Sequence, residues 1–431
     1  MQPGRARWAY LVVSFVMNIM LGSAYSWSVF TLPLTQQYGA DAFTAMLPFA
    51  VALGTFSLGM VFAGRLVDKH GPRKIAMVGG LLVAGGYLLS YFMDKSPLSP
   101  IVTLVLTYGV VMGVGIGFSY NAPIPTAARW FPERRGLATG IVVMGYGLSP
   151  LFTAPLASAL IGPQMPYNVP FAFLVMGLLF LVVLVPLGSL LKFPPPGWKA
   201  PEPKKAAVSK RTWAPVVDME TRAVLRTPTF WSAWLLYVVG TAGGFMVIGN
   251  AKAIALGMKD LGGTQVTPLL GTVAVMLLAV FNSVGRPIFG RSADAYGPRR
   301  TLTVMYVVML GAMAVLSLAT VYEGFLVGVA ITGVVFGGFL AVMPTLSAFF
   351  FGQKNLGSNY GVLFTGYGLG ALVATFAIGP IYNAFKSYVP AFYVGIVLSL
   401  VGLAISFLVR PPRPAAVKAV EHEGEKAPIR A

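Results

Sequence analysis

The stretch FNSVGRPIFGRSADAYGPRR, Phe281–Arg300, joins the end of a long apolar run to a charged segment. Arg286 lies between the apolar residues Val273–Val284 and Pro287–Gly290. If this run crosses a lipid bilayer, Arg286 lies inside the membrane, where inserting an arginine costs about 2.5–3.5 kcal/mol. An ionisable residue at that depth marks a functional site by default. The stretch therefore predicts a membrane protein with Arg286 at its site.

The charged segment has a counterpart about half a chain earlier. Gly64–Lys74, GRLVDKHGPRK, and Gly290–Arg300, GRSADAYGPRR, carry Gly, Asp, Gly and a basic pair at the same spacings, and we expect both to be loops. A second pair, Gly136–Leu148 and Gly357–Leu369, repeats its glycines and a Tyr-Gly-Leu in the same way. Small residues at such spacings let membrane helices approach closely. The repetition predicts a duplicated unit.

Composition indicates a membrane protein with many spans. The chain is 56% hydrophobic and 10% charged, whereas about 25% charged residues is normal for soluble domains. Apolar runs of about 20 residues recur along its length, as transmembrane helices require. We predict twelve spans, with approximate bounds of 8–33, 43–63, 75–92, 99–128, 136–161, 168–191, 228–256, 266–289, 301–319, 325–351, 358–384 and 388–409.

The segment between the sixth and seventh spans contains FPPPGWKAPEPKK, which cannot cross a membrane. We therefore expect an N-terminal six-helix bundle over 1–192, a cytoplasmic linker over 193–226 and a C-terminal six-helix bundle over 227–410. The tail over 411–431 is rich in Pro, Lys and Glu and is expected to be disordered. The predicted fold class is an all-α membrane protein with twelve transmembrane helices in two six-helix bundles. A duplicated architecture of this kind places its substrate site at mid-membrane between the bundles.

The net charge of +18 reflects topology rather than nucleic-acid binding. Most of the 31 lysines and arginines fall in the N-terminus, the C-terminal tail and the loops on one side of the predicted spans. Only Lys95, Lys252, Lys259 and Lys386 fall on the other side. This is the positive-inside pattern, so we expect a multi-pass protein of the cell (inner) membrane with both termini cytoplasmic.

The sequence lacks the residues that several classes of function require. The chain has no cysteine, and its two histidines, His70 and His422, fall in a predicted loop and in the tail, so no metal site or cofactor is expected. The glycine-rich runs do not follow a strand, so they are not dinucleotide motifs. No acidic residue falls in mid-span, and we expect no enzyme. A receptor or scaffold remains a remote alternative, because the longest soluble segment is the linker.

Five stretches of the sequence resemble a known family. Gly64–Lys74 resembles the loop 2–3 signature of the major facilitator superfamily, and Gly290–Arg300 resembles its weaker second copy. WFPERRGLATG, Trp130–Gly140, is similar to the motif with which monocarboxylate transporters enter their fifth span. Gly22–Trp27 and Leu225–Trp231 resemble the bacterial branch, which is related to oxalate:formate antiporters. The resemblance implies the major facilitator fold and transport by alternating access.

This chain lacks charged residues that two related groups of carriers have in their spans. Animal monocarboxylate carriers have an aspartate four residues before the span-eight arginine, where this chain has Asn282, and a first-span lysine, which is missing between Trp8 and Gln36. Oxalate carriers have a lysine in span eleven, where this chain has Tyr367. One buried cation rather than two suits a substrate with one carboxylate.

Arg286 is the main candidate for binding that carboxylate, because a guanidinium offers two parallel donors. The alternative is a structural arginine satisfied by helix carbonyls or by an acid, but no acid is near it in the span. Asn282 lies one turn away on the same face and contacts either the substrate or another helix. Tyr367 either donates its hydroxyl to a lactate-like substrate or packs.

The other binding candidates are polar or aromatic residues of membrane spans. Adjacent residues of a helix point in different directions, so one of Tyr120 and Asn121 is expected to face the cavity. Tyr25, Trp27 and Phe336 are candidates for its apolar side. Their alternative role is packing or anchoring at the membrane interface.

The resemblance also implies residues for gating. Aspartate and basic residues of the loop 2–3 signature and its copy are expected to latch the bundles on the cytoplasmic side, assisted by helix dipoles. Positive-inside anchoring is the alternative, and it accounts for the basic residues but not for the repeated Gly and Asp. The residues concerned are Asp68, Arg73, Lys74, Asp294, Arg299 and Arg300.

Together with Arg286, the resemblance implies a secondary active transporter of short-chain monocarboxylates such as lactate or pyruvate. The carboxylate docks on Arg286, and rocking of the two halves exposes it to the other side. The resemblance implies proton-coupled symport, for which Asp260 near the outer end of span seven is the nearest candidate carrier. The proton riding on the substrate is the other possibility. A carboxylate exchanger of the oxalate:formate kind is the alternative function, and we expect the protein to work as a monomer.

Overall fold

The computed structural model describes residues 3–40, 42–162, 166–195, 197–198 and 218–412. These residues contain 12 helical spans long and apolar enough to cross a membrane, which confirms the predicted fold class. Each predicted span overlaps one of them. The spans are Arg7–Thr31, Thr44–His70, Pro72–Asp94, Pro100–Trp130, Arg135–Ile161, Val169–Leu190, Pro228–Ile248, Leu270–Tyr296, Pro298–Leu318, Tyr322–Phe351, Leu356–Tyr382 and Val389–Leu408.

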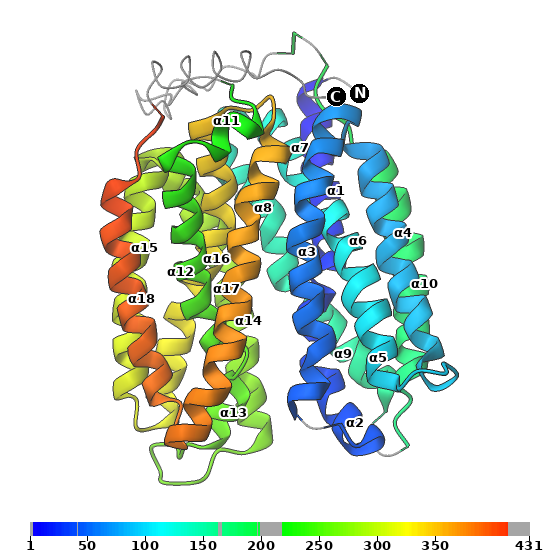
Figure 1. Cartoon of the computed structure of the whole chain (residues 1–431), viewed down its shortest axis with the longest axis vertical. Helices are drawn as coiled ribbons and strands as arrows, with labels where there is room; N and C mark the ends of the chain where they lie inside the picture. The colour runs from blue at the N-terminus through cyan, green and yellow to red at the C-terminus, as the bar shows by residue number, and fades with distance from the viewer. Residues whose placement is uncertain (1–2, 41, 163–165, 196, 199–217, 413–431) are drawn as a thin grey trace, which may run out of the picture.

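The helices form two groups that lie side by side (Figure 1). The first half consists of α1 (Pro3–Leu21), η1 (Gly22–Ser26), α2 (Ser28–Tyr38), α3 (Ala42–His70), α4 (Pro72–Ser90), η2 (Tyr91–Asp94), α5 (Pro100–Leu104), η3 (Val105–Met112), α6 (Gly113–Tyr120), α7 (Pro123–Trp130), α8 (Arg135–Leu148), α9 (Pro150–Ile161) and α10 (Val169–Leu190). The second half consists of α11 (Thr221–Leu225), α12 (Pro228–Ile248), α13 (Ala251–Leu256), α14 (Pro268–Tyr296), α15 (Pro298–Leu318), α16 (Tyr322–Phe351), α17 (Leu356–Phe385) and α18 (Val389–Leu408).

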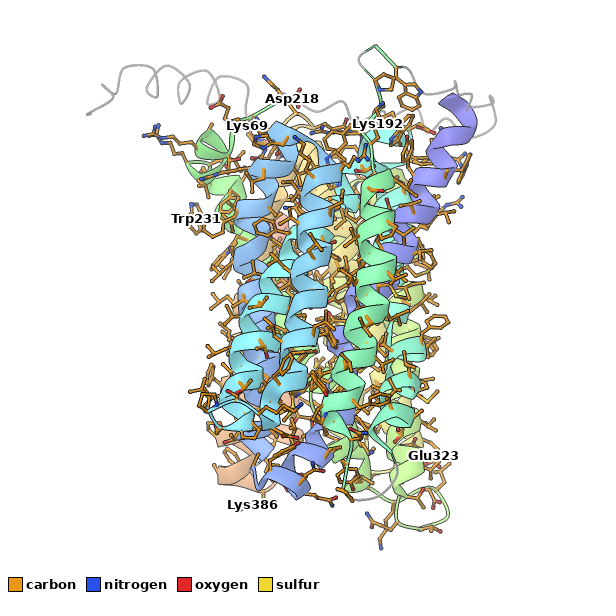
Figure 2. All side chains as sticks on the ribbon, turned by 90° about the vertical axis from the view of Figure 1, so that its right-hand side faces the viewer. Lys69, Lys192, Asp218, Trp231, Glu323 and Lys386 are labelled. Atoms are coloured by element: carbon orange, nitrogen blue, oxygen red, sulfur yellow. The ribbon has the colours of Figure 1, made fainter. Side chains whose placement is uncertain are left out.

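The two ends of the molecule differ in the residues that they carry. Lys69, Lys192 and Asp218 lie at one end, which we call the basic end, and Glu323 and Lys386 lie at the other (Figure 2). Helix α1 begins and α18 ends at the basic end (Figure 1). The halves meet mainly where α3 packs on α17 and α8 packs on α14. These four helices therefore enclose the centre of the molecule.

The segments predicted as charged loops are largely helical, which corrects the sequence analysis. Helix α3 continues to His70 and α4 starts at Pro72, so the single residue between them is Gly71, with φ 82°. Gly297, with φ 84°, separates α14 from α15 in the same way. Glycine adopts positive φ without strain, and proline suits the first position of a helix. The charged residues are thus carried on helix ends.

The first and fourth spans each contain a break in the regular α-helix. The first is broken by the 3₁₀ segment η1, and the fourth by the turn at Asn121 and Ala122 between α6 and α7. Both turn residues are buried. Non-helical backbone at membrane depth is tolerated where protein buries it or where it lines a cavity. These breaks place Tyr25 and Tyr120 beside the centre of the molecule.

The predicted linker over 193–226 and tail over 411–431 fall largely outside the described residues. The linker's described end contains the short helix α11 and lies against the second half. The backbone N–H of Met219 donates to the carbonyl of Phe351 at 2.9 Å, and Asp218 accepts hydrogen bonds from the backbone of Gln353 and Lys354 at 2.6 and 3.0 Å.

Candidate functional site

Arg286 lies on α14 at the interface of the two halves and is fully buried. Its Nη1 donates to the carbonyl of Val143 on α8, in the other half. Its Nε and Nη2 donate to Oδ1 of Asn282 at 3.2 and 3.1 Å. The i, i+4 spacing predicted this neighbour. Arg286 takes part in neither of the two ion pairs found in the described part of the chain. The hydrogen-bond acceptors of its guanidinium are therefore uncharged oxygens.

Aromatic side chains from both halves surround the guanidinium. The ring centroid of Tyr146 lies 6.0 Å from Cζ of Arg286. Tyr25 meets Tyr146 edge to face at 4.9 Å, lies beside the guanidinium and shares a hydrogen bond with the Tyr367 hydroxyl. Phe364 stacks on Tyr367 at 4.7 Å. We define the central cluster as Arg286, Asn282, Tyr25, Tyr146 and Tyr367.

Phe336 and Trp27 have different surroundings. Phe336 lies 6.4 Å from Tyr367, at the edge of the central cluster. Trp27 donates its indole N–H to the Ala45 carbonyl at 3.0 Å and packs on Tyr108 at 4.5 Å, inside the first half. Residues two apart in a helical segment point in nearly opposite directions. The structure therefore brings Tyr25 to the cluster and directs Trp27 away from it.

Tyr120 and Asn121 also separate, as their adjacency predicts. The ring of Tyr120 meets Tyr146 edge to face at 5.3 Å. The Asn121 amide donates instead to the carbonyls of Met60, at 2.9 Å, and Gly357, at 3.2 Å. Tyr120 therefore adjoins the central cluster, whereas Asn121 joins the halves nearer the basic end.

Asp68 and Asp294 each cap a helix of the opposite half. Asp68, on α3, accepts hydrogen bonds from the backbone N–H of Gly357 at 3.2 Å and of Ser358 at 2.7 Å, at the start of α17. Asp294, on α14, accepts from the backbone N–H of Gly136 at 2.8 Å and of Leu137 at 2.9 Å, at the start of α8. The first N–H groups of a helix lack partners within it and favour a negative charge. The two repeated motifs thus bind each other across the interface.

Repeated glycines make this contact close. A Cβ atom on Gly64 would collide with the carbonyl of Gly357, and one on Gly290 would collide with the carbonyl of Gly136. Side chains at these four positions would push the helices apart. Together with Asp68, Asp294 and Asn121, these contacts close the basic end in this conformation.

Within the described residues, no hydrogen bond or ion pair joins the basic residues predicted for gating to the other half. Arg73, Lys74 and Arg300 are exposed. Arg299 donates to the carbonyls of Ser406 at 3.4 Å and Phe407 at 2.8 Å, within its own half.

Sequence reasoning missed Arg129, which does bridge the halves. It pairs with Asp68 at 3.2 Å and donates to the carbonyls of Gln353 and Lys354 at 3.1 and 2.9 Å. Its position directly after a predicted span, one residue before the WFPERR motif, was the available signal.

Asp260 lies outside the central cluster. Its carboxylate accepts a hydrogen bond from the backbone N–H of Thr264 at 2.8 Å, in the turn between α13 and α14. The adjoining Leu261 donates to Glu323, which lies at the end opposite the basic end (Figure 2). The structure thus gives Asp260 a role in a turn, away from Arg286.

The sequence model of the Major Facilitator Superfamily matches residues 11–281 and 241–431. The chain belongs to the major facilitator superfamily. An oxalate:formate antiporter of Oxalobacter formigenes is 28% identical over 380 residues, which cover 86% of this chain and 85% of that protein. Monocarboxylate transporter 10 of Homo sapiens is 24% identical over 420 residues, 92% of this chain and 77% of that protein. These relatives confirm the resemblance found in the sequence.

Solved structures agree on the fold. The major facilitator superfamily transporter FucP, in its outward conformation, matches with a TM-score of 0.70 and 14% identity, over 93% of this chain and 99% of that one. At this identity the likeness concerns the fold alone. Within the superfamily fold, this chain's own residues form the central cluster and the contacts that close the basic end.

Proposed function

We propose that this protein is a secondary active transporter of short-chain monocarboxylates of about the size of lactate and pyruvate, with Arg286 binding the carboxylate. The observation that carries the proposal is a fully buried guanidinium between the two halves that only neutral oxygens contact in the described chain. A carboxylate is a stronger acceptor than an amide or carbonyl oxygen and fits the guanidinium with two parallel hydrogen bonds. The names of the relatives support a carboxylate substrate.

The surroundings of Arg286 favour a small substrate with an apolar end. Tyr25, Tyr146 and Tyr367 present ring faces and edges beside the guanidinium. Oxalate carriers have a lysine in span eleven as a second cation, and this chain has Tyr367 at that position. A hydroxyl in place of an ammonium binds an α-hydroxyl or α-keto oxygen better than a second carboxylate.

In the proposed mechanism the two halves alternate between exposing the central cluster to either side. The structure is the conformation in which the basic end is closed. We propose that this end faces the cytoplasm, because lysine and arginine concentrate there. One chain supplies both halves of the cluster, so the proposed working unit is the monomer in the cell membrane.

Proton-coupled symport is our first proposal for the energy source, and anion exchange is the second. Exchange is favoured by one observation: no acidic side chain accompanies Arg286 among the described residues, so the substrate itself neutralises a buried charge. An uncompensated buried charge is costly, and the loaded carrier would then change conformation more readily than the empty one. In symport the proton would have to travel on the substrate or on a group outside the central cluster.

The test is uptake of radiolabelled L-lactate into proteoliposomes that contain wild-type protein, Arg286→Ala or the exposed control Arg300→Ala. Uptake driven by an inward proton gradient and lost only in Arg286→Ala is the expected result. Uptake that ignores the gradient but rises with internal carboxylate identifies an exchanger. Wild-type rates in Arg286→Ala would overturn the role of Arg286, provided that all three proteins elute as single species after solubilisation.

A further inference from the structure

Three tyrosines between the central cluster and the basic end have hydroxyls without a hydrogen-bond partner. Tyr120 of α6, Tyr237 of α12 and Tyr360 of α17 are fully buried. Their ring centroids lie 5.8, 6.0 and 5.6 Å from that of Phe364. None of the three hydroxyls has a partner in the part of the chain that the structure describes, although Tyr360 lies beside both of the others. We call these residues the tyrosine triad.

Among the other buried tyrosines of the described chain, Tyr108 and Tyr146 also lack a partner for their hydroxyls, but they lie outside this group and three others find one. The Tyr87 hydroxyl donates to Ser23 at 3.0 Å, that of Tyr322 donates to the Leu270 carbonyl at 2.5 Å, and that of Tyr306 donates to the Leu236 carbonyl. Leaving a buried hydroxyl unpaired costs about 1–3 kcal/mol. Phenylalanine would avoid that cost at each position of the triad. Three unpaired hydroxyls that gather on one ring therefore indicate a ligand for them.

The triad lies between Arg286 and the contacts that close the basic end. Asn121, next to Tyr120, donates to the carbonyl of Gly357, and Tyr360 follows Gly357 by less than one turn of α17. On the other side, Phe364 stacks on Tyr367 of the central cluster. Tyr120 belongs to the first half and the other two to the second, so the triad divides when the halves part at the basic end.

We propose that the tyrosine triad is a second binding point for the substrate carboxylate, which the substrate occupies when the basic end opens. This inference rests on the proposed function. The triad offers three O–H donors, and each of its members also lies within the electrostatic influence of Arg286. An anion there would be bound by hydroxyls and still attracted by the guanidinium. Substrate arriving from the basic end would bind the triad before Arg286, and substrate arriving from the other end would not.

The test compares the two sides of the membrane. Half-saturation concentrations for L-lactate are measured in right-side-out and inside-out membrane vesicles for wild type, Tyr237→Phe and Tyr360→Phe. Tyr108→Phe is the matched control, because that tyrosine is also buried with an unpaired hydroxyl but packs on Trp27 inside the first half. Removal of an unpaired hydroxyl does not weaken the fold, so all variants are expected to be stable.

The expected result is a rise of about tenfold in the half-saturation concentration at the basic end, the value of one hydrogen bond to a charged group, with no change at the opposite end. Tyr108→Phe is expected to match wild type at both ends. Unchanged values at both ends in the triad variants, or equal rises at both ends, would overturn the second binding point while leaving the role of Arg286 intact. A wild-type protein that moves no carboxylate would overturn both proposals.

Discussion

Asn282 orients the Arg286 side chain without neutralising its positive charge. Its single Oδ1 accepts two hydrogen bonds from the guanidinium, at 3.2 and 3.1 Å, and so fixes the orientation of the arginine. The amide oxygen carries only a partial charge, so it does not neutralise the cation. In the proposed function, a substrate carboxylate binds the guanidinium more strongly than this amide oxygen does, because the carboxylate carries a full charge. An amide at this position therefore orients Arg286 and leaves it available.

Asn282→Asp is expected to weaken substrate binding. The new carboxylate would form a charged, two-bond pair with Arg286 at the i, i+4 spacing and compete with the substrate. We expect the half-saturation concentration for lactate in proteoliposomes to rise by about tenfold or more. Ser283→Ala, a change at the adjacent residue, serves as the control. A half-saturation value that stays at the wild-type level in Asn282→Asp would show that the substrate does not bind at this pair.

At this scale, the sequence predicted what depends on local spacing. Arg286 was identifiable because an arginine is expensive in an apolar run, and Asn282 because it lies one turn away. Val143 and Tyr146 were not identifiable, because their contact with Arg286 depends on how α8 packs against α14. Trp27 shows the same limit: aromatic composition suggested the site, but the direction of the side chain placed it in the core of the first half.

At the scale of elements, the glycines of α3 and α17 allow two helix backbones to touch. A Cβ on Gly64 would collide with the Gly357 carbonyl and lie 2.8 Å from Cα of Ser358, whereas a Cβ on Gly54 of the same helix would meet nothing within 4 Å. Backbone atoms cannot move aside as flexible side chains do. The crossing of α3 and α17 therefore requires Gly64, and only this close crossing brings Asp68 to the first N–H groups of α17.

Gly64→Ala is expected to open the basic end, whereas Gly54→Ala is not. Overpacking costs about 1–3 kcal/mol, which shifts the closed-to-open ratio by about tenfold. The chain has no cysteine, so Thr345→Cys, at a buried contact with Thr139 of the other half, gives a single reporter thiol. An impermeant maleimide applied from the basic end should label this thiol about tenfold faster when Gly64→Ala is present. Equal labelling with Gly64→Ala and Gly54→Ala would contradict the argument.

The sequence revealed both repeated motifs but not how they meet. Gly64–Lys74 and Gly290–Arg300 were recognised as one pair, and Gly136–Leu148 and Gly357–Leu369 as another. Nothing local indicates that a member of one pair binds a member of the other across the interface, because that contact depends on the relative position of the two halves. The charged segments were also predicted as loops, since the helical turns that carry Asp68 are as polar as a loop.

At the scale of the whole molecule, duplication produces two contacts between the halves. We call the contact of Asp68 with the start of α17 the Asp68 latch and that of Asp294 with the start of α8 the Asp294 latch, and the two differ in strength. Asp294 accepts hydrogen bonds from two backbone N–H groups of α8. Asp68 accepts from two backbone N–H groups of α17, from the Ser358 hydroxyl at 2.8 Å and from Arg129 at 3.2 Å. Charged hydrogen bonds are about twice as strong as neutral ones. The Asp68 latch should therefore contribute more to closure of the basic end.

Removing both latches should open the basic end more than the two single changes together. Asp68→Asn and Asp294→Asn keep the size of the side chain but remove its charge, so each weakens one latch. In the proposed mechanism each half moves as a packed body, so one intact latch still holds the halves together at the basic end. We expect labelling of Thr345→Cys from that end to rise by about tenfold in Asp68→Asn and by less in Asp294→Asn, with the double variant the fastest by far.

The exposed residues Arg73 and Lys74 supply the control for the latches. Both flank the same motif as Asp68, but within the described residues no hydrogen bond or ion pair joins them to the other half, so Arg73→Ala and Lys74→Ala should leave labelling at the level of the Thr345→Cys background. Arg129→Ala, in contrast, should act like a partial loss of Asp68, because it removes the ion pair and two bonds to the α16–α17 turn. If Arg73→Ala opened the basic end as far as Asp68→Asn, the basic pair would be part of the latch. Closure would then depend on the basic charge along the helix ends rather than on the two aspartates that cap α17 and α8.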